Sequence, residues 1–240
     1  MNFDYFEYTN QGGRDYNEDC VGSKVYEQDA IFVVADGLGG HSYGEVASGC
    51  VVDTLVDDFN MGIDDIHVWI NQEIEKANQL VLETQKEKRA VLKSTAALLT
   101  VQGKKLTFAH VGDSRLYFIH SNEIKYFTED HSVAYKKFKA GEITRENIPS
   151  DDDQSRLLRS IGGEDHHEPS IFTYPLKAES GDAIMICSDG AWEYIADTEI
   201  LIDYLKSADA KTWAENMLLR IMDRVDGKND NLSITTVILE

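Results

Sequence analysis

Four aspartates stand where an apolar, strand-like segment of the sequence meets a turn. They are Asp36, Asp113, Asp189 and Asp230. Asp36 follows the apolar run 31–35 and precedes the glycine-rich segment 37–40, while Asp189 follows another apolar run and precedes Gly190. Glycine beside aspartate allows a backbone carbonyl or a ligand to approach closely. If the strands run to the same rim of a sheet, these carboxylates could converge there.

Clustered carboxylates repel one another, and a hard divalent cation such as Mg²⁺ or Mn²⁺ offsets that repulsion through oxygen coordination. Two such ions about 3.5–4 Å apart can hold a bridging water, lower its pKa and present hydroxide to phosphorus. Asp19, in the triplet Asn17-Glu18-Asp19, could join the cluster, and the planar fork of Arg14 suits two phosphate oxygens. Each feature alone is more typical of a turn or a solvated surface residue. Together they indicate metal-dependent phosphate chemistry.

The composition is that of an acidic globular protein. The 240 residues include 23 Lys and Arg against 43 Asp and Glu, a net charge of −20 that disfavours nucleic acids and anionic membrane surfaces as partners. Apolar residues make up 42% of the chain, enough to form a sizeable core, so fibrous and disordered classes are excluded.

The cysteines and the N-terminus predict a protein of the cytoplasm. Cys20, Cys50 and Cys187 are an odd number without CxxC spacing, which argues against a disulfide framework and a structural zinc site. The N-terminus lacks the basic and apolar regions of a signal peptide, and no apolar run approaches the roughly 20 residues of a membrane span.

Short strands and amphipathic helices are both predicted. Strand-like segments lie at 3–8, 21–26, 31–35, 95–101, 106–111, 115–120, 171–174, 183–187 and 232–239. Apolar stripes at helical spacing run through 47–59, 66–81 and 213–225. The turns Gly103-Lys104 and Ser121-Asn122 are too short for helical crossovers, so the sheets should be mostly antiparallel. An α+β sandwich with helices outside is favoured over a doubly wound parallel sheet.

No repeat, linker or internal boundary interrupts the chain, so residues 1–240 are expected to form a single catalytic domain. The one polar stretch, 136–154, reads as a surface excursion rather than a core element.

Seven motifs occur together in the order of one known family. They are Arg14-x-x-Asn17-Glu18-Asp19, Asp36-Gly37-Leu38-Gly39-Gly40-His41, Ser94-Thr95-Ala96, His110-Val111-Gly112-Asp113-Ser114-Arg115, Asp130-His131-Ser132, Ser188-Asp189-Gly190 and Asp230-Asn231. With these motifs the chain resembles the protein phosphatase 2C family, the metal-dependent PPM serine/threonine phosphatases, in their compact bacterial form. The resemblance runs from about residue 8 to the C-terminus.

The resemblance implies a four-layer αββα sandwich of two mostly antiparallel sheets flanked by helix pairs. It also implies a centre of two Mn²⁺ or Mg²⁺ ions that hydrolyses phosphoserine and phosphothreonine by direct attack of a bridging water. In this family pattern Asp36 bridges the metals, Gly37 lends its carbonyl, Asp19 binds largely through water, and Asp189 and Asp230 complete the shells.

The same resemblance assigns roles to the residues around these ligands. Arg14 binds the phosphate and, with Asp36, is counted as catalytic. Asp113 belongs to a third, weaker metal site. Residues expected to support the metal ligands are Glu18, His41 and Asn231.

Two departures from the family pattern affect the mechanism. Glu193 stands where the partner of Asp113 is usually an aspartate, so the carboxylate is kept on a longer arm and occupancy of the third site is open. Leu38 stands where the eukaryotic branch has a histidine proposed as general acid, so the leaving oxygen must take its proton from water or another group.

Residues 134–163 match the position of the family's variable flap beside the active site. The flap carries the acidic turn Asp151-Asp152-Asp153, and one hypothesis is that this turn favours phosphosites flanked by basic residues. A solvated loop without that role is the alternative.

The remaining histidine motifs are interpreted as structural. His110 is expected in the core, Asp130 or Ser132 as a helix cap, and His166 and His167 outside any metal site. The expected partners are phosphoproteins made by a serine/threonine kinase, and the protein is expected to be a monomer. A catalytically silent binding module and a small-molecule phosphatase remain alternatives of the same fold.

Overall fold

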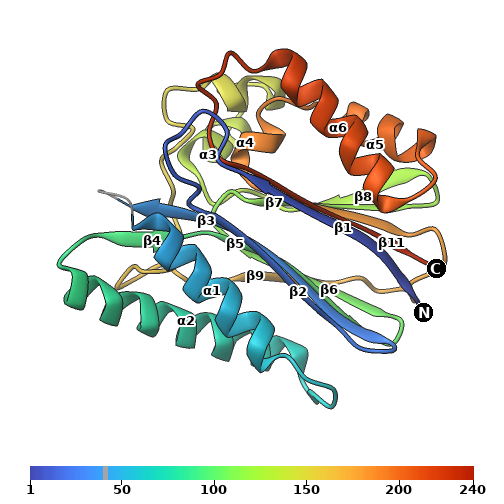
Figure 1. Cartoon of the computed structure of the whole chain (residues 1–240), viewed down its shortest axis with the longest axis horizontal. Helices are drawn as coiled ribbons and strands as arrows, with labels where there is room; N and C mark the ends of the chain where they lie inside the picture. Colours follow the sequence, from blue (N-terminus) through green and yellow to red (C-terminus); the bar gives the residue numbers. More distant parts are fainter. Residues whose placement is uncertain (40–42) are drawn as a thin grey trace.

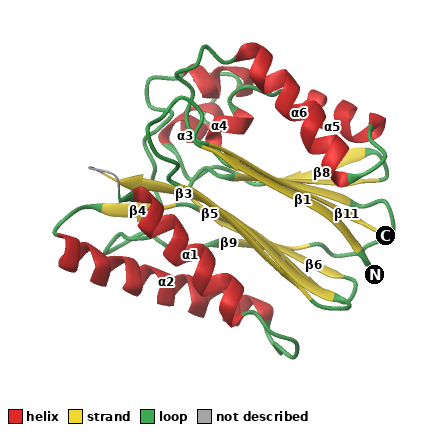
Figure 2. Cartoon of the chain, viewed as in Figure 1, coloured by secondary structure: helices red, strands yellow, loops and turns green. Residues whose placement is uncertain are grey.

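The computed structural model describes residues 1–39 and 43–240. Two antiparallel sheets pack face to face, and helices cover both outer faces (Figures 1 and 2). This arrangement confirms the α+β sandwich. In the described ranges no helix is long and apolar enough to cross a membrane.

The first sheet joins the two ends of the chain. Its strands, in spatial order, are β1 (Phe3–Asn10), β11 (Leu232–Leu239), β10 (Ala183–Cys187), β7 (Arg115–His120) and β8 (Glu123–Phe127). β1 and β11 pair along their full length, from Phe3 opposite Leu239 to Asn10 opposite Leu232, so the termini lie close together (Figure 1).

The second sheet carries the longest strand. Its order is β2 (Asp19–Val25), β3 (Asp29–Gly39), β5 (Ala96–Gln102), β6 (Lys105–Val111) and β9 (Ser170–Thr173), and β4 (Leu92–Ser94) pairs with the end of β3. The turns predicted between 101 and 106 and between 120 and 123 are present. The strand predicted at 95–101 is present as β5, whereas β4 was not predicted. Between the two strands, Thr95 donates its backbone N–H to the Asp36 carbonyl at 2.8 Å.

Helices flank each sheet. α1 (Gly44–Asp58) and α2 (Ile66–Lys88) cover the second sheet, while α5 (Asp197–Lys206) and α6 (Ala210–Arg224) cover the first (Figure 1). Shorter helices, α3 (Val133–Lys139) and α4 (Asp189–Trp192), lie at one end of the first sheet. α5 was not predicted, because its ten residues complete fewer than three turns and its buried residues are only Ile200 and Asp203.

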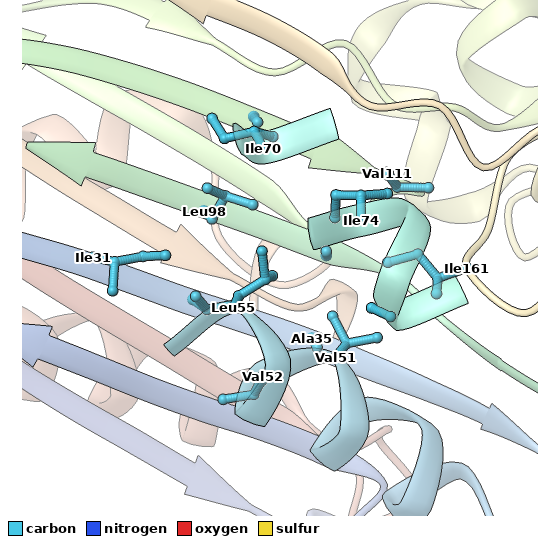
Figure 3. Close-up of a cluster of buried hydrophobic side chains, with 14 of the residues drawn as sticks. Ile31, Ala35, Val51, Val52, Leu55, Ile70, Ile74, Leu98, Val111 and Ile161 are labelled. Atoms are coloured by element: carbon cyan, nitrogen blue, oxygen red, sulfur yellow. The ribbon is translucent and has the colours of Figure 1, made fainter. Parts of the chain in front are cut away.

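Strand alternation divides the core into layers. Residues 31, 33 and 35 of β3 pack against the helices, whereas residues 30, 32 and 34 pack between the sheets. Figure 3 shows the helix layer, in which Ile31 and Ala35 meet Val51 and Leu55 of α1 and Ile70 of α2. This alternation continues to the end of β3 and decides which face its last side chains occupy.

The polar stretch 136–154 is more ordered than a surface excursion. It contains most of α3 and a 3₁₀ helix, η1 (Arg145–Ser150). Ile148 of this stretch, and Tyr135 just before it, are buried in the same cluster as residues of α5 and α6. These few apolar side chains pack the otherwise charged segment against the first sheet and its helices.

Candidate active site

Asp19 and Asp36 face each other across two neighbouring strands. Asp19 begins β2, Asp36 lies near the end of β3, and the two are directly opposed in the antiparallel register. Opposed residues place their side chains on the same face, and for Asp36 this is the face that looks toward the other sheet. The two carboxylates therefore lie together at the mouth between the sheets.

Asp189 and Asp230 reach the same mouth from the first sheet. Asp189 is the first residue of α4 after β10, and Asp230 stands just before β11, the strand that pairs with β10. Ser188 connects the sheets, since its hydroxyl lies 2.7 Å from Asp19 Oδ2 and accepts the Ser233 backbone N–H at 3.0 Å. The sequence motif contained Ser188, but only the packing of the two sheets gives it this role.

Two glycines are required by close backbone approach. A Cβ on Gly37 would collide with the carbonyl of Gly44 at the start of α1, and a Cβ on Gly190 would collide with the carbonyl of Asn231. Any side chain at either place would push apart the segments that carry Asp36 and Asp189.

Glu18 and Asn231 tie the segments of the site together. The Glu18 backbone N–H donates to Asn231 Oδ1 at 2.8 Å, and Glu18 Oε1 accepts the Gly44 N–H at 2.9 Å. Asn231 also donates its amide to the carbonyls of Gln11 and Tyr16, at 2.9 and 2.8 Å. These bonds fix the N-terminal loop, β2 and β11 relative to one another.

The aspartates of the site repel one another and are buried, and both effects disfavour their charged forms. Burial, together with the charges of Asp189 and Asp230, raises the pKa of Asp19 to about 7. Burial and the Asp230 charge raise the pKa of Asp189 to about 6, and burial with the surrounding aspartates raises the pKa of Asp36 well above its usual value. Asp19 Oδ1 and Asp189 Oδ1 are buried without a hydrogen-bond partner in the described structure.

This site fits a hard divalent cation in its chemistry. The donors are carboxylate oxygens, two of them are buried without a partner, and positive charge would relieve the repulsion that raises their pKa values. In the part of the chain described, no three His, Cys, Asp or Glu side chains already enclose a point as in a preformed metal cage. Mg²⁺ keeps several water ligands, so it does not require every carboxylate to touch the ion.

An open cleft of about 400 Å³ leads to these carboxylates. Its lining includes Arg14, Tyr16, Asp36, Leu38 and Asp230. Arg14 Nη2 lies 2.6 Å from Asp230 Oδ2, with 58% of the arginine side chain exposed. The guanidinium is thus held at the rim and is accessible to a ligand in the cleft.

Asp113, between β6 and β7, and Glu193, directly after α4, extend the acidic field around Asp189. Burial and the Asp189 charge raise the pKa of Asp113 well above its usual value, and the same causes raise the pKa of Glu193 to about 8. The Asp113 carbonyl accepts the Trp192 indole N–H at 3.0 Å, which fixes the Asp113 backbone beside α4.

Neighbouring motif residues have structural contacts. His110 is buried, its Nε2 lies 2.8 Å from the Glu129 carbonyl, and its ring stacks on His131 at 4.4 Å. Ser132 caps α3 by accepting the Tyr135 N–H, as predicted for this motif. Asp130 instead forms a buried ion pair with Arg115.

The two neighbouring histidines, His166 and His167, lie apart from these contacts. His167 pairs with Glu75 of α2. His41 and Gly40 lie outside the described residues.

The acidic turn of the flap is not a free negative surface. Lys137 Nζ lies 2.7 Å from Asp151 Oδ1 and 2.8 Å from Asp153 Oδ2, and Arg156 pairs with Asp153 at 2.8 Å. Of the three aspartates, Asp152 is exposed, while Asp151 and Asp153 are half-buried. The hypothesis that this turn attracts basic substrates assumed three free negative charges. Lys137 and Arg156 of the flap already pair with two of them, Asp151 and Asp153.

Comparison with known proteins identifies the family. The family model described as protein phosphatase 2C matches residues 10–223. The serine/threonine phosphatase stp of Listeria welshimeri is 31% identical over 234 residues, covering 93% of this chain and 90% of its own. The protein phosphatase PhpP of Streptococcus pneumoniae is 30% identical over 234 residues, covering 93% and 92%.

A solved structure adds the metal content of a relative. The catalytic domain of the serine/threonine protein phosphatase PstP, solved in complex with two manganese ions, superposes with a TM-score of 0.85 at 25% identity and covers 99% of both chains. The sequence match, the sandwich and the carboxylate cluster agree: this chain belongs to the protein phosphatase 2C family of serine/threonine phosphatases.

Proposed function

We propose that this protein removes phosphate from phosphoserine and phosphothreonine in proteins, using two Mn²⁺ or Mg²⁺ ions held between the ends of its two sheets. The observation that carries the proposal is the opposition of Asp19 and Asp36 on β2 and β3, with Asp189 brought against them from the other sheet. The two manganese ions in the related PstP structure support the same assignment.

In this proposal Asp36 and the Gly37 carbonyl would both hold the ions, with Asp36 shared between them. Asp19, Asp189 and Asp230 complete the ligand set, in part through water. Bound ions would activate a water for direct attack on phosphorus, which would break the bond to the serine or threonine oxygen without a phosphoenzyme. The negative charges of the carboxylates lower the stability of the metal-free protein. The same charges would provide its affinity for metal ions.

Arg14 would hold the phosphate at the rim. Its exposed guanidinium can form two parallel hydrogen bonds to phosphate oxygens, while the contact with Asp230 orients it. Leu38 has no titratable proton, so the leaving oxygen would take its proton from water in the open cleft or from another group. Glu18 and Asn231 would position the ligand segments through the hydrogen bonds described above.

Asp113 and Glu193 would form a third, weaker cation site. Both carboxyls have raised pKa values for which the Asp189 charge is a shared cause, and this supports their belonging to one extended acidic field. The longer arm of glutamate should make this site weaker than the pair at Asp36.

The wider setting is part of the same proposal. We infer one catalytic domain over residues 1–240, acting as a monomer on the products of a serine/threonine kinase. The three cysteines are free thiols, which supports a reducing compartment such as the cytoplasm.

The test is hydrolysis of p-nitrophenyl phosphate and a phosphothreonine peptide after EDTA treatment, with and without added Mn²⁺ or Mg²⁺. Wild type should turn over only with metal, and Asp36→Asn and Asp189→Asn should not. Asp152→Asn, which removes an exposed carboxylate on the flap, is the matched control and should behave as wild type. Folded, metal-loaded wild type without turnover would contradict the proposal and favour a silent binding module.

A further inference from the structure

The last residues of β3 leave the main sheet and form a short ribbon with β4 beside the cleft. In this β3–β4 ribbon, residues 37–39 pair with residues 92–94, and Leu38 lies directly opposite Lys93. β4 is held on its other side as well, because Ser94 and Ile161 exchange two backbone hydrogen bonds at 2.9 and 2.8 Å. The backbone of Lys93 is therefore fixed between β3 and the end of the flap.

Strand alternation places Lys93 on the cleft side of the ribbon. Leu92 is buried in the helix-side core and Ser94 is also buried, whereas Lys93 is exposed. Leu38, its opposed neighbour, lines the cleft together with Asp36 and Arg14. Because opposed residues share a face, the stem of Lys93 starts beside Leu38 and on the same side as the carboxylates.

The ammonium group has no partner within the described residues. Lys93 forms neither an ion pair nor a side-chain hydrogen bond there, although acidic residues outnumber basic ones 43 to 23 in the chain. Arg14, which lines the cleft, is already paired with Asp230. Lysine is a flexible point charge, so its ammonium can follow a mobile carboxylate across the rim.

The flap cannot supply a competing negative surface of three charges. Asp151 and Asp153 are neutralised by Lys137 and Arg156, as shown above. Lys93 is thus an unpaired cation beside Leu38, available to a substrate segment that lies over that residue.

We propose that Lys93 is a specificity-determining residue that binds an acidic side chain flanking the phosphorylated residue of the substrate. This inference rests on the proposed function and names its substrate class: phosphoserine or phosphothreonine with aspartate or glutamate close by in the sequence. Leu38 provides the apolar floor over which the flanking segment passes.

The experiment compares three phosphothreonine peptides that differ only in flanking residues, which are glutamate, glutamine or lysine. The readout is the ratio of kcat/KM for the glutamate peptide to that for the glutamine peptide. Lys93→Gln should lower this ratio about two- to fivefold, the range expected for one exposed ion pair, and Lys93→Glu should invert the preference toward the lysine peptide. The wild-type ratio should also shrink at high salt.

Lys104→Gln is the matched control. Lys104 is exposed in the β5–β6 turn, at the end of those strands away from the cleft, so its loss changes net charge equally and should leave the ratio as in wild type. An equal fall in the ratio in both variants, or an unchanged ratio in Lys93→Gln, would overturn the role of Lys93. Failure of wild type on p-nitrophenyl phosphate would instead overturn the proposed function itself.

Discussion

Asp130 and the carboxylates of the candidate site lie near the same end of the first sheet, but they differ in whether a protein cation neutralises them. Asp130 accepts two hydrogen bonds from the Arg115 guanidinium, from Nε at 2.8 Å and from Nη2 at 2.6 Å. The same guanidinium lies over the Trp192 ring, 3.5 Å from its centroid. Asp19 and Asp189 each keep one buried oxygen without a hydrogen-bond partner, and burial raises the pKa of both.

The presence or absence of a partner cation separates structural carboxylates from those available to a ligand. A buried carboxylate matched by a protein cation serves the structure, because removing either partner leaves an uncompensated charge. Asp19 and Asp189 form no ion pair within the described residues, so their buried charges cost stability unless a cation comes from outside. The contrast predicts opposite consequences when a charge is removed from each group.

The largest effect is expected on activity. Asp36→Asn should lower metal-dependent kcat/KM by about 10³-fold, because it removes the carboxylate proposed to bridge the ions. The same variant should leave the metal-free protein at least as stable as wild type, since one repelling charge is lost. Turnover assays and urea unfolding in EDTA measure the two effects; a destabilised metal-free variant would argue against repulsion at this site.

The Arg115–Asp130 pair should show the reverse pattern. Arg115→Met is expected to destabilise the metal-free protein by about 3–5 kcal/mol, because Asp130 would remain buried without its partner. Urea unfolding measures the loss. The double variant with Asp130→Leu should recover most of it, and a single variant as stable as wild type would remove the contrast between the two groups.

Stability of the metal-free protein should fall as pH rises through the range set by the site. The pKa values of Asp19 and Asp189 are raised to about 7 and about 6, so the folded state keeps protons that the unfolded state loses near pH 4. Their stabilising contribution is complete below pH 4 and is lost as the pH rises from 4 to 7. Urea unfolding in EDTA across this range measures it, and Asp19→Asn with Asp189→Asn should flatten the profile.

The smallest effect belongs to the acidic turn of the flap. Replacing Asp151, Asp152 and Asp153 with asparagine should change kcat/KM for a basic phosphopeptide less than about twofold, because two of the three charges already have partners. A several-fold fall in kcat/KM that affects only the basic peptide would show instead that the turn contributes to substrate specificity.

The sequence alone predicted the parts of the site that depend on local pattern. An aspartate after an apolar run and before glycine correctly indicated that a strand ends just before Asp189, and the turns predicted antiparallel pairing. The same pattern at Asp36 was wrong about the strand end, because β3 continues to Gly39 by pairing with β4. The Ser188–Asp19 hydrogen bond and the Lys137–Asp151 pair were not predictable, since each joins residues that only the packing of distant segments brings together. For the same reason, the motif containing Asp130 suggested a helix cap before the fold revealed its pairing with Arg115.

The central claim is that the unmatched carboxylates are held for cations. The most direct measurement is calorimetric titration of Mn²⁺ into EDTA-treated, dialysed protein near neutral pH, for wild type, Asp36→Asn and Asp152→Asn. Wild type and Asp152→Asn should each bind two ions tightly, while Asp36→Asn should lose that stoichiometry. Wild type that binds no Mn²⁺, or Asp36→Asn that binds it as well as wild type does, would contradict the account.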